Sequence, residues 1–135
     1  MFLQELQKSE KKVFLELAFL IANKNGSITP KDRLTFENYR RELGLAKTEY
    51  KIEGKNVSDL NLTLKRFPKK TQKVFLLELI SLALNSNDKL MAEDEVFKEL
   101  LEVWHLEKYD FNKMKRWVDA FNDLLVEGYI LLEDK

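Results

Sequence analysis

One stretch of this chain occurs twice: residues 11–37 and 73–99 match each other at a shift of 62 positions. Each copy consists of an almost unbroken apolar segment, a polar segment with two asparagines, and a further segment opened by acidic residues. This pattern predicts a repeated pair of helices, with halves at about 11–45 and 73–106. The matching pairs are Lys11/Lys73, Glu16/Glu78, Leu17/Leu79, Leu20/Leu82, Asn23/Asn85, Asn25/Asn87, Asp32/Asp94 and Glu37/Glu99.

The composition agrees with a helical fold. Of the 135 residues, 44% are apolar, which is enough for the core of one compact domain. The chain has only four glycines and two prolines, too few for the many turns of an all-β domain. We therefore predict a single all-α domain over residues 1–135, a helical bundle of about six or seven helices with two pseudo-repeated halves.

Two segments are too apolar for surface helices with one wet face. Every residue from 13 to 22 except Glu16 is apolar, and residues 74–84 repeat this composition. We predict that these two helices lie side by side in the middle of the bundle. Leu3 and Leu6 are interpreted as a backward extension of the first helix.

Capping residues and prolines suggest where the other helices begin and end. The last helix keeps apolar residues at steps of three and four from Phe111 to Leu125. For the tail, residues 129–132, a docked extension and a short strand remain alternatives. The other predicted elements are a helix from the Thr29–Pro30 cap to Gly44, a connection over 46–56, a short helix from a Ser58–Asp59 cap to Pro68, a helix whose first turn holds Glu93, Asp94 and Glu95, and a last helix from an Asp110 cap to Gly128.

Charge and residue types argue against several functions. Lysine plus arginine equals aspartate plus glutamate at 23 each, so no net field attracts a nucleic-acid backbone. There is no cysteine, and the usual nucleophile and phosphate-transfer motifs are missing. The single histidine, His105, is expected to pack or to cap a helix. We predict a cytoplasmic protein that is not an enzyme, without a signal peptide or a membrane span.

The polar segments between the helices, residues 23–29 and 85–91, are called the elbows below. Their spacing resembles part of a calcium loop, in which oxygen ligands stand at positions 1, 3, 5 and 12 and glycine at position 6. With Gly26 at position 6, position 1 is Ile21, which has no ligand atom. In the second elbow Ala83 stands at position 1. A true EF-hand is therefore excluded, and a weak divalent-cation site is the alternative that remains.

Two glutamates join these elbow residues as candidate ligands, because Glu16 and Glu78 lie two turns earlier on the same helix face. The competing interpretation is structural: asparagines end a helix, acidic residues open the next one, and Thr29 with Asp32 forms a capping box. We favour the structural interpretation. The candidate metal residues are Glu16, Asn23, Asn25, Asp32, Glu78, Asn85, Asn87, Asp88 and Asp94.

Charged residues also gather in two groups of opposite sign. Such groups usually form a solvated surface, but segregated charge also suits protein partners or head-to-tail self-association. The basic group is Lys65, Arg66, Lys69, Lys70 and Lys73, and the acidic group is Glu93, Asp94, Glu95, Glu99 and Glu102.

The order of these motifs, over residues 22–28, 42–45, 60–68 and 79–94, resembles the TerB-like family associated with tellurite resistance. The resemblance implies an all-helical domain of two related halves, elbows that bind metal ions, and a link to stress-response complexes near the membrane. The chain departs from the family pattern at five positions. Asn25 and Asn87 stand where the family has aspartate, Asp32 and Asp94 where it has glutamate, and Asp88 where it has the second glycine.

We therefore predict a non-enzymatic interaction or scaffold module with protein partners, a second copy of the chain among the alternatives. The second hypothesis is a metal-ion sensor or buffer that uses the two elbows. A third, a helical DNA-binding domain with a wing at residues 129–132, is disfavoured by the neutral charge.

Overall fold

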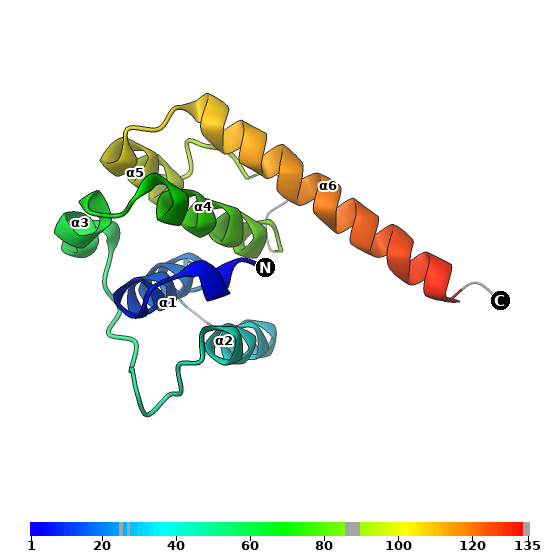
Figure 1. Ribbon diagram of the computed structural model, residues 1–135, viewed down its shortest axis with the longest axis horizontal. Coiled ribbons are helices and arrows are strands. Elements are labelled where there is room, and N and C mark those ends of the chain that lie inside the picture. Colours follow the sequence, from blue (N-terminus) through cyan, green and yellow to red (C-terminus); the bar gives the residue numbers. More distant parts are fainter. Residues whose placement is uncertain (25, 27, 86–89, 134–135) are drawn as a thin grey trace.

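The computed structural model of this chain describes residues 1–24, 26, 28–85 and 90–133. Secondary structure in this described part is entirely helical, which confirms the all-α class. Figure 1 shows that most helices gather into one body, from which the C-terminal half of the last helix extends away. The elements are η1 (Leu3–Glu5), α1 (Lys8–Ala22), α2 (Pro30–Leu43), α3 (Val57–Lys65), α4 (Lys69–Leu84), α5 (Glu95–Trp104) and α6 (Lys108–Glu133).

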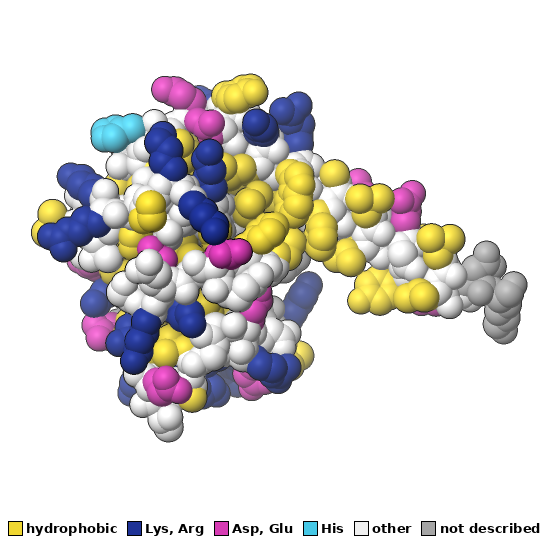
Figure 2. All heavy atoms as spheres, in the orientation of Figure 1, with side chains coloured by type: hydrophobic (Ala, Val, Ile, Leu, Met, Phe, Trp, Pro, Cys, Tyr) yellow, Lys and Arg dark blue, Asp and Glu magenta, His cyan; other side chains and the backbone are white. Residues whose placement is uncertain are grey.

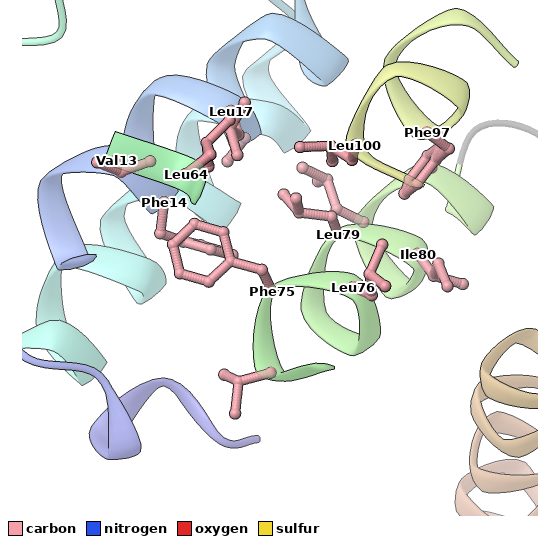
Figure 3. Close-up of a cluster of buried hydrophobic side chains, with 14 of the residues drawn as sticks. Val13, Phe14, Leu17, Leu64, Phe75, Leu76, Leu79, Ile80, Phe97 and Leu100 are labelled. Carbon is pink, nitrogen blue, oxygen red and sulfur yellow. The ribbon is translucent and has the colours of Figure 1, made fainter. Parts of the chain in front are cut away.

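Helices α1 and α4 lie side by side at the centre of the body, as their apolar sequences predict. The ring of Phe14 on α1 meets the ring of Phe75 on α4 edge to face, with centroids 5.6 Å apart, and both are fully buried (Figure 3). Side chains from η1 and from all six α-helices enter this core. The two central helices thus organise one shared core.

Helix α2 begins and ends where its capping residues predict. The Thr29 hydroxyl accepts the N–H of Asp32 at 3.1 Å, and the Asp32 carboxylate accepts the N–H of Thr29 at 3.0 Å. This reciprocal capping box precedes Pro30, the first helical residue. Gly44 closes the helix at φ 67°, a left-handed conformation that glycine adopts without strain.

The predicted backward extension of α1 is wrong. Leu3 lies in the separate turn η1, and the backbone of Leu6 is extended, with ψ 145°. Helix α1 starts after Gln7, whose N–H donates to the Glu10 carboxylate at 2.8 Å. This capping box fixes the N-terminal end of α1, and the chain before it leaves the axis of the helix.

Two predicted N-caps are third helical residues instead. Asp59 accepts the N–H of Asn56 at 3.1 Å, and Asn56 accepts the N–H of Asp59 at 2.8 Å, so Asn56 is the N-cap of α3 and Ser58 lies inside the helix. At the start of α6, Asp110 likewise accepts the N–H of Glu107, at 2.9 Å. In each case an acidic residue at the third helical position accepts the N–H of the residue before the helix, and in the sequence it resembles an N-cap.

Helix α5 also begins later than predicted. Its first residue is Glu95, so Glu93 and Asp94 precede the first turn. At its other end, His105 adopts φ 54° as the C-cap, in agreement with the predicted capping role of this histidine.

Gly128 does not end the last helix. Helix α6 continues through residues 129–132 to Glu133, so the tail is neither a strand nor a docked extension. A glycine inside a helix costs about 1 kcal/mol relative to alanine, which the strong helix formers on both sides outweigh. No helix in the described ranges is both long and apolar enough to cross a membrane.

Candidate functional site

Both elbows open onto one cavity of about 920 Å³. The ends of α1 and α4 and the beginnings of α2, α3 and α5 contribute to its walls. Four of the predicted metal residues line it: Asn23 and Asp32 from the first half, Asn85 and Asp94 from the second. The structure therefore brings described parts of both elbows to the same place.

The two aspartates of this cavity have structural partners. Asp32 belongs to the capping box of α2, and the Asp94 carboxylate accepts the N–H of Met91 at 3.2 Å. Asn25, Asn87 and Asp88 lie outside the described residues. Within the described ranges, no three acidic or histidine side chains come together as a metal-binding group. The arrangement agrees with the capping interpretation, and the metal site stays a prediction.

Glu16 does not line this cavity, although it was predicted to share a ligand set with Asn23. Its side chain is only 1% exposed and faces the connection between α2 and α3. There it accepts backbone N–H groups from Glu53 at 2.8 Å, Gly54 at 2.9 Å and Lys55 at 2.9 Å. The Tyr50 hydroxyl donates a fourth hydrogen bond. One buried carboxylate thus fixes a connection that lacks regular structure.

The electrostatics of this carboxylate follow from its surroundings. Burial opposes ionisation and alone would raise the pKa of Glu16, but the four hydrogen bonds outweigh burial and lower that pKa. The pKa of Tyr50 is raised, because its hydroxyl is desolvated and bonded to the negative charge of Glu16. Glu16 is therefore ionised at neutral pH, and its role here is to hold the backbone.

Glu78, the counterpart of Glu16 in the sequence repeat, also lies outside the cavity lining. Its side chain is 5% exposed and accepts the Phe2 N–H at 2.6 Å and the Met1 ammonium at 2.8 Å. Burial alone would lower the pKa of this ammonium, but its bonds to Glu78 and Glu42 raise it. Each of these two glutamates thus holds a segment that lies far away in sequence.

A second feature is the part of α6 beyond the body, residues 121–133, which we call the projecting half. Every residue from Asp123 to Glu133 is exposed except Gly128, which is half-buried. Figure 2 shows hydrophobic side chains where α6 leaves the body and along the part that projects. The large exposed apolar residues here are Leu124, Leu125, Val126, Tyr129, Ile130, Leu131 and Leu132.

The sequence predicts one continuous apolar stripe along this helix, but the structure divides it. Phe111 and Val118 are fully buried against the body, whereas Leu124 is 64% exposed. At the point of division, Trp117 contacts Phe2 and stacks on Phe121, with centroid distances of 5.9 and 5.5 Å. The projecting half was not predicted as a surface, although apolar residues on all sides of a single helix were visible in the sequence.

Comparison with known proteins adds no relatives. The chain matches no family model, and neither a curated protein nor a solved structure matches it significantly.

Proposed function

We propose that this chain is a non-enzymatic interaction module of the TerB-like type, which presents the projecting half of α6 to a protein partner. One observation carries the proposal: a helix that is anchored in the core at Phe111 and Val118 continues beyond the body with its leucines exposed. Monomeric proteins rarely expose a contiguous apolar surface of this kind, and such a surface typically marks a binding site.

The energetics favour a partner for this surface. The described part of the projecting half from Asp123 to Glu133 spans roughly 16 Å at 1.5 Å per residue. Each large apolar side chain that leaves water contributes about 1.5–3 kcal/mol. A partner that covers several of these side chains therefore gains enough free energy to offset the entropy of association.

The buried carboxylates support a structural rather than a catalytic protein. Glu16 holds three backbone N–H groups, Glu78 holds the Phe2 N–H and the Met1 ammonium, and Glu10 accepts the Gln7 N–H and the Thr71 hydroxyl. The hydrogen bonds to Glu16 stabilise its ionised form and lower its pKa. General acid–base catalysis would instead require a pKa near neutral pH.

The resemblance to the TerB-like family and the pseudo-repeat remain part of this proposal. The packing of α1 on α4 and the similar roles of Glu16 and Glu78 support two related halves. The second helices differ in their neighbours, since α2 contacts α1 and η1 whereas α5 chiefly contacts α3. A stress-response role of the family's kind is the function we propose for the whole domain.

If the projecting half binds a protein partner, a charged substitution in it should abolish that binding. We expect an affinity-tagged wild-type chain, purified from its own cells, to retain partner proteins that the Leu124→Glu variant loses. The reason is that a glutamate in the projecting half would have to be desolvated in any complex that buries this surface. Quantitative mass spectrometry of the retained proteins measures the effect.

The matched control is Leu62→Glu, which places the same charge at a leucine of α3 that is 73% exposed. This variant should retain the same partners as the wild type. Equal partner sets for all three proteins would contradict a role of the projecting half in binding other proteins.

A metal sensor is the second candidate, because Asn23, Asp32, Asn85 and Asp94 line one cavity. If the elbows bind an ion, calcium, magnesium or zinc at 100 times the dissociation constant should stabilise the fold by about 2.7 kcal/mol. A thermal melt by circular dichroism, with millimolar ion and with chelator, measures this shift.

Two substitutions distinguish a role of Asp32 as a metal ligand from its role in a helix cap. Asp32→Asn should abolish an ion-dependent shift, whereas Asp59→Asn weakens the equivalent capping box of α3 and should leave the shift intact. No shift of the wild-type midpoint with any of the three ions would remove the sensor hypothesis.

A further inference from the structure

Charge changes sign along α6. Its first half, residues 108–120, carries four basic and two acidic side chains, whereas the projecting half carries three acidic side chains and no basic one. Two such helices attract each other when they run antiparallel, because the basic half of each then lies beside the acidic half of the other. A parallel arrangement would bring like charges together.

An apolar seam runs along the same helix. Its members alternate at steps of three and four, which is the spacing by which two helices pack along a coiled-coil seam. The seam continues from the half-buried part of α6 into the projecting half. It consists of Met114, Trp117, Phe121, Leu124, Gly128 and Leu131.

One flank of the seam carries Lys113, Ala120 and Glu127, seven residues apart and all exposed. In an antiparallel pair the same flank of both helices meets, so Lys113 lies beside Glu127 of the second helix and Ala120 beside its own counterpart. In a parallel pair this flank would instead meet the opposite one, which holds Leu125 and Leu132. Glutamate would then face leucine, so the flanks favour the antiparallel arrangement.

We infer that the projecting half of α6 binds a second copy of this chain, in a two-fold symmetric antiparallel pair of α6 helices centred near Ala120. The inference rests on the proposed interaction role and names the partner. In this pair Leu124 and Leu125 of each projecting half lie beside the first half of the other α6. The same surface patch serves both copies, as a closed two-fold interface requires.

The mass of the chain in solution tests the pair. Wild type should sediment at twice the 16.0 kDa of one chain at about 100 μM, a concentration at which a micromolar dimer is well populated. Leu124→Glu should sediment as the monomer with unchanged helical content, and Leu62→Glu as the dimer. A wild-type chain that is monomeric at this concentration overturns the inference.

A charge swap tests the antiparallel register. Lys113→Glu and Glu127→Lys should each weaken the dimer roughly tenfold, because each introduces two like-charge contacts into a two-fold pair. The double variant Lys113→Glu/Glu127→Lys should restore wild-type affinity. Additive weakening in the double variant would overturn the pairing of these residues.

Single cysteines give a second test of the arrangement, since the chain has none of its own. Under mild oxidation Ala120→Cys should form a disulfide-linked dimer, and Leu131→Cys should not. Rapid cross-linking through Leu131→Cys with none through Ala120→Cys would indicate a parallel pair and overturn the inference.

Failure of this inference can be told apart from failure of the interaction role. A monomeric wild-type chain whose cellular partners are lost in Leu124→Glu overturns the dimer and leaves the wider role in place. A dimer that Leu124→Glu dissociates, with the set of other bound proteins unchanged, supports the inference and limits the interaction role to self-association.

Discussion

Replacing Phe75 by alanine should lower the free energy of unfolding by about 3–5 kcal/mol. Phe75 is fully buried, and its ring contacts three others: Phe67 at 5.0 Å, Phe14 at 5.6 Å and Trp104 at 6.2 Å between centroids. These rings come from α1, from the α3–α4 junction and from the end of α5. The substitution therefore opens a cavity where several helices meet.

The loss approaches the whole stability of an ordinary domain, about 5–15 kcal/mol. Urea unfolding followed by circular dichroism measures it. Phe75→Leu keeps most of the apolar volume and should cost about half as much or less, whereas Leu62→Ala at an exposed position of α3 should stay within about 0.5 kcal/mol. A loss below about 1 kcal/mol for Phe75→Ala would contradict a core shared by α1 and α4.

The central helices could be predicted because their sequences admit few alternatives. A segment such as 13–22, with a single charged residue, has no wet face and must be covered on all sides. The boundaries of α2 were equally accessible, since Thr29, Asp32 and Gly44 act through backbone groups only a few residues away. Local chemistry of this kind can be read directly from the sequence.

The role of Glu16 could not be predicted, although its position stood out. Its partners, from Tyr50 to Lys55, lie 34 to 39 residues away in a segment that the sequence identifies only as a connection. The donors are mostly backbone N–H groups, which every residue except proline carries. No sequence pattern therefore marks them as the partners of a particular carboxylate.

The exposure of Leu124 and Leu125 has a different cause. Helical spacing places both on the apolar stripe that begins at Phe111, and the spacing is correct. The spacing of apolar residues does not reveal how far the body extends beneath the helix. The body ends before Leu124, so this part of the stripe is exposed. The length of α6 and the size of the body are determined by separate parts of the chain. The sequence of α6 alone therefore does not indicate that the helix is longer than the surface it packs on.

Replacing Glu16 by glutamine should lower the free energy of unfolding by about 2–4 kcal/mol at neutral pH. Hydrogen bonds to a charged group contribute about 1.5–3 kcal/mol, and buried N–H groups left without an acceptor add a further penalty. The glutamine amide nitrogen cannot accept the N–H groups that one carboxylate oxygen now satisfies. Tyr50→Phe removes one of the four donors and should cost about 1–2 kcal/mol. Glu53→Gln alters an exposed side chain of the same connection and should stay within about 0.5 kcal/mol.

The pH dependence of the unfolding free energy distinguishes the contribution of the charge of Glu16 from that of its packing. Because folding lowers the pKa of Glu16 from its ordinary value of 4.5, the stabilisation by this group is fully present above that value and is lost as the pH falls through the folded-state pKa. Glutamine does not titrate, so the difference in unfolding free energy between wild type and Glu16→Gln should be constant above about pH 5.5 and shrink progressively below pH 4.5. Urea unfolding of both proteins from acidic to neutral pH measures this difference. If it stays constant across the whole range, the carboxylate acts through packing alone, and its charge does not hold the connection between α2 and α3.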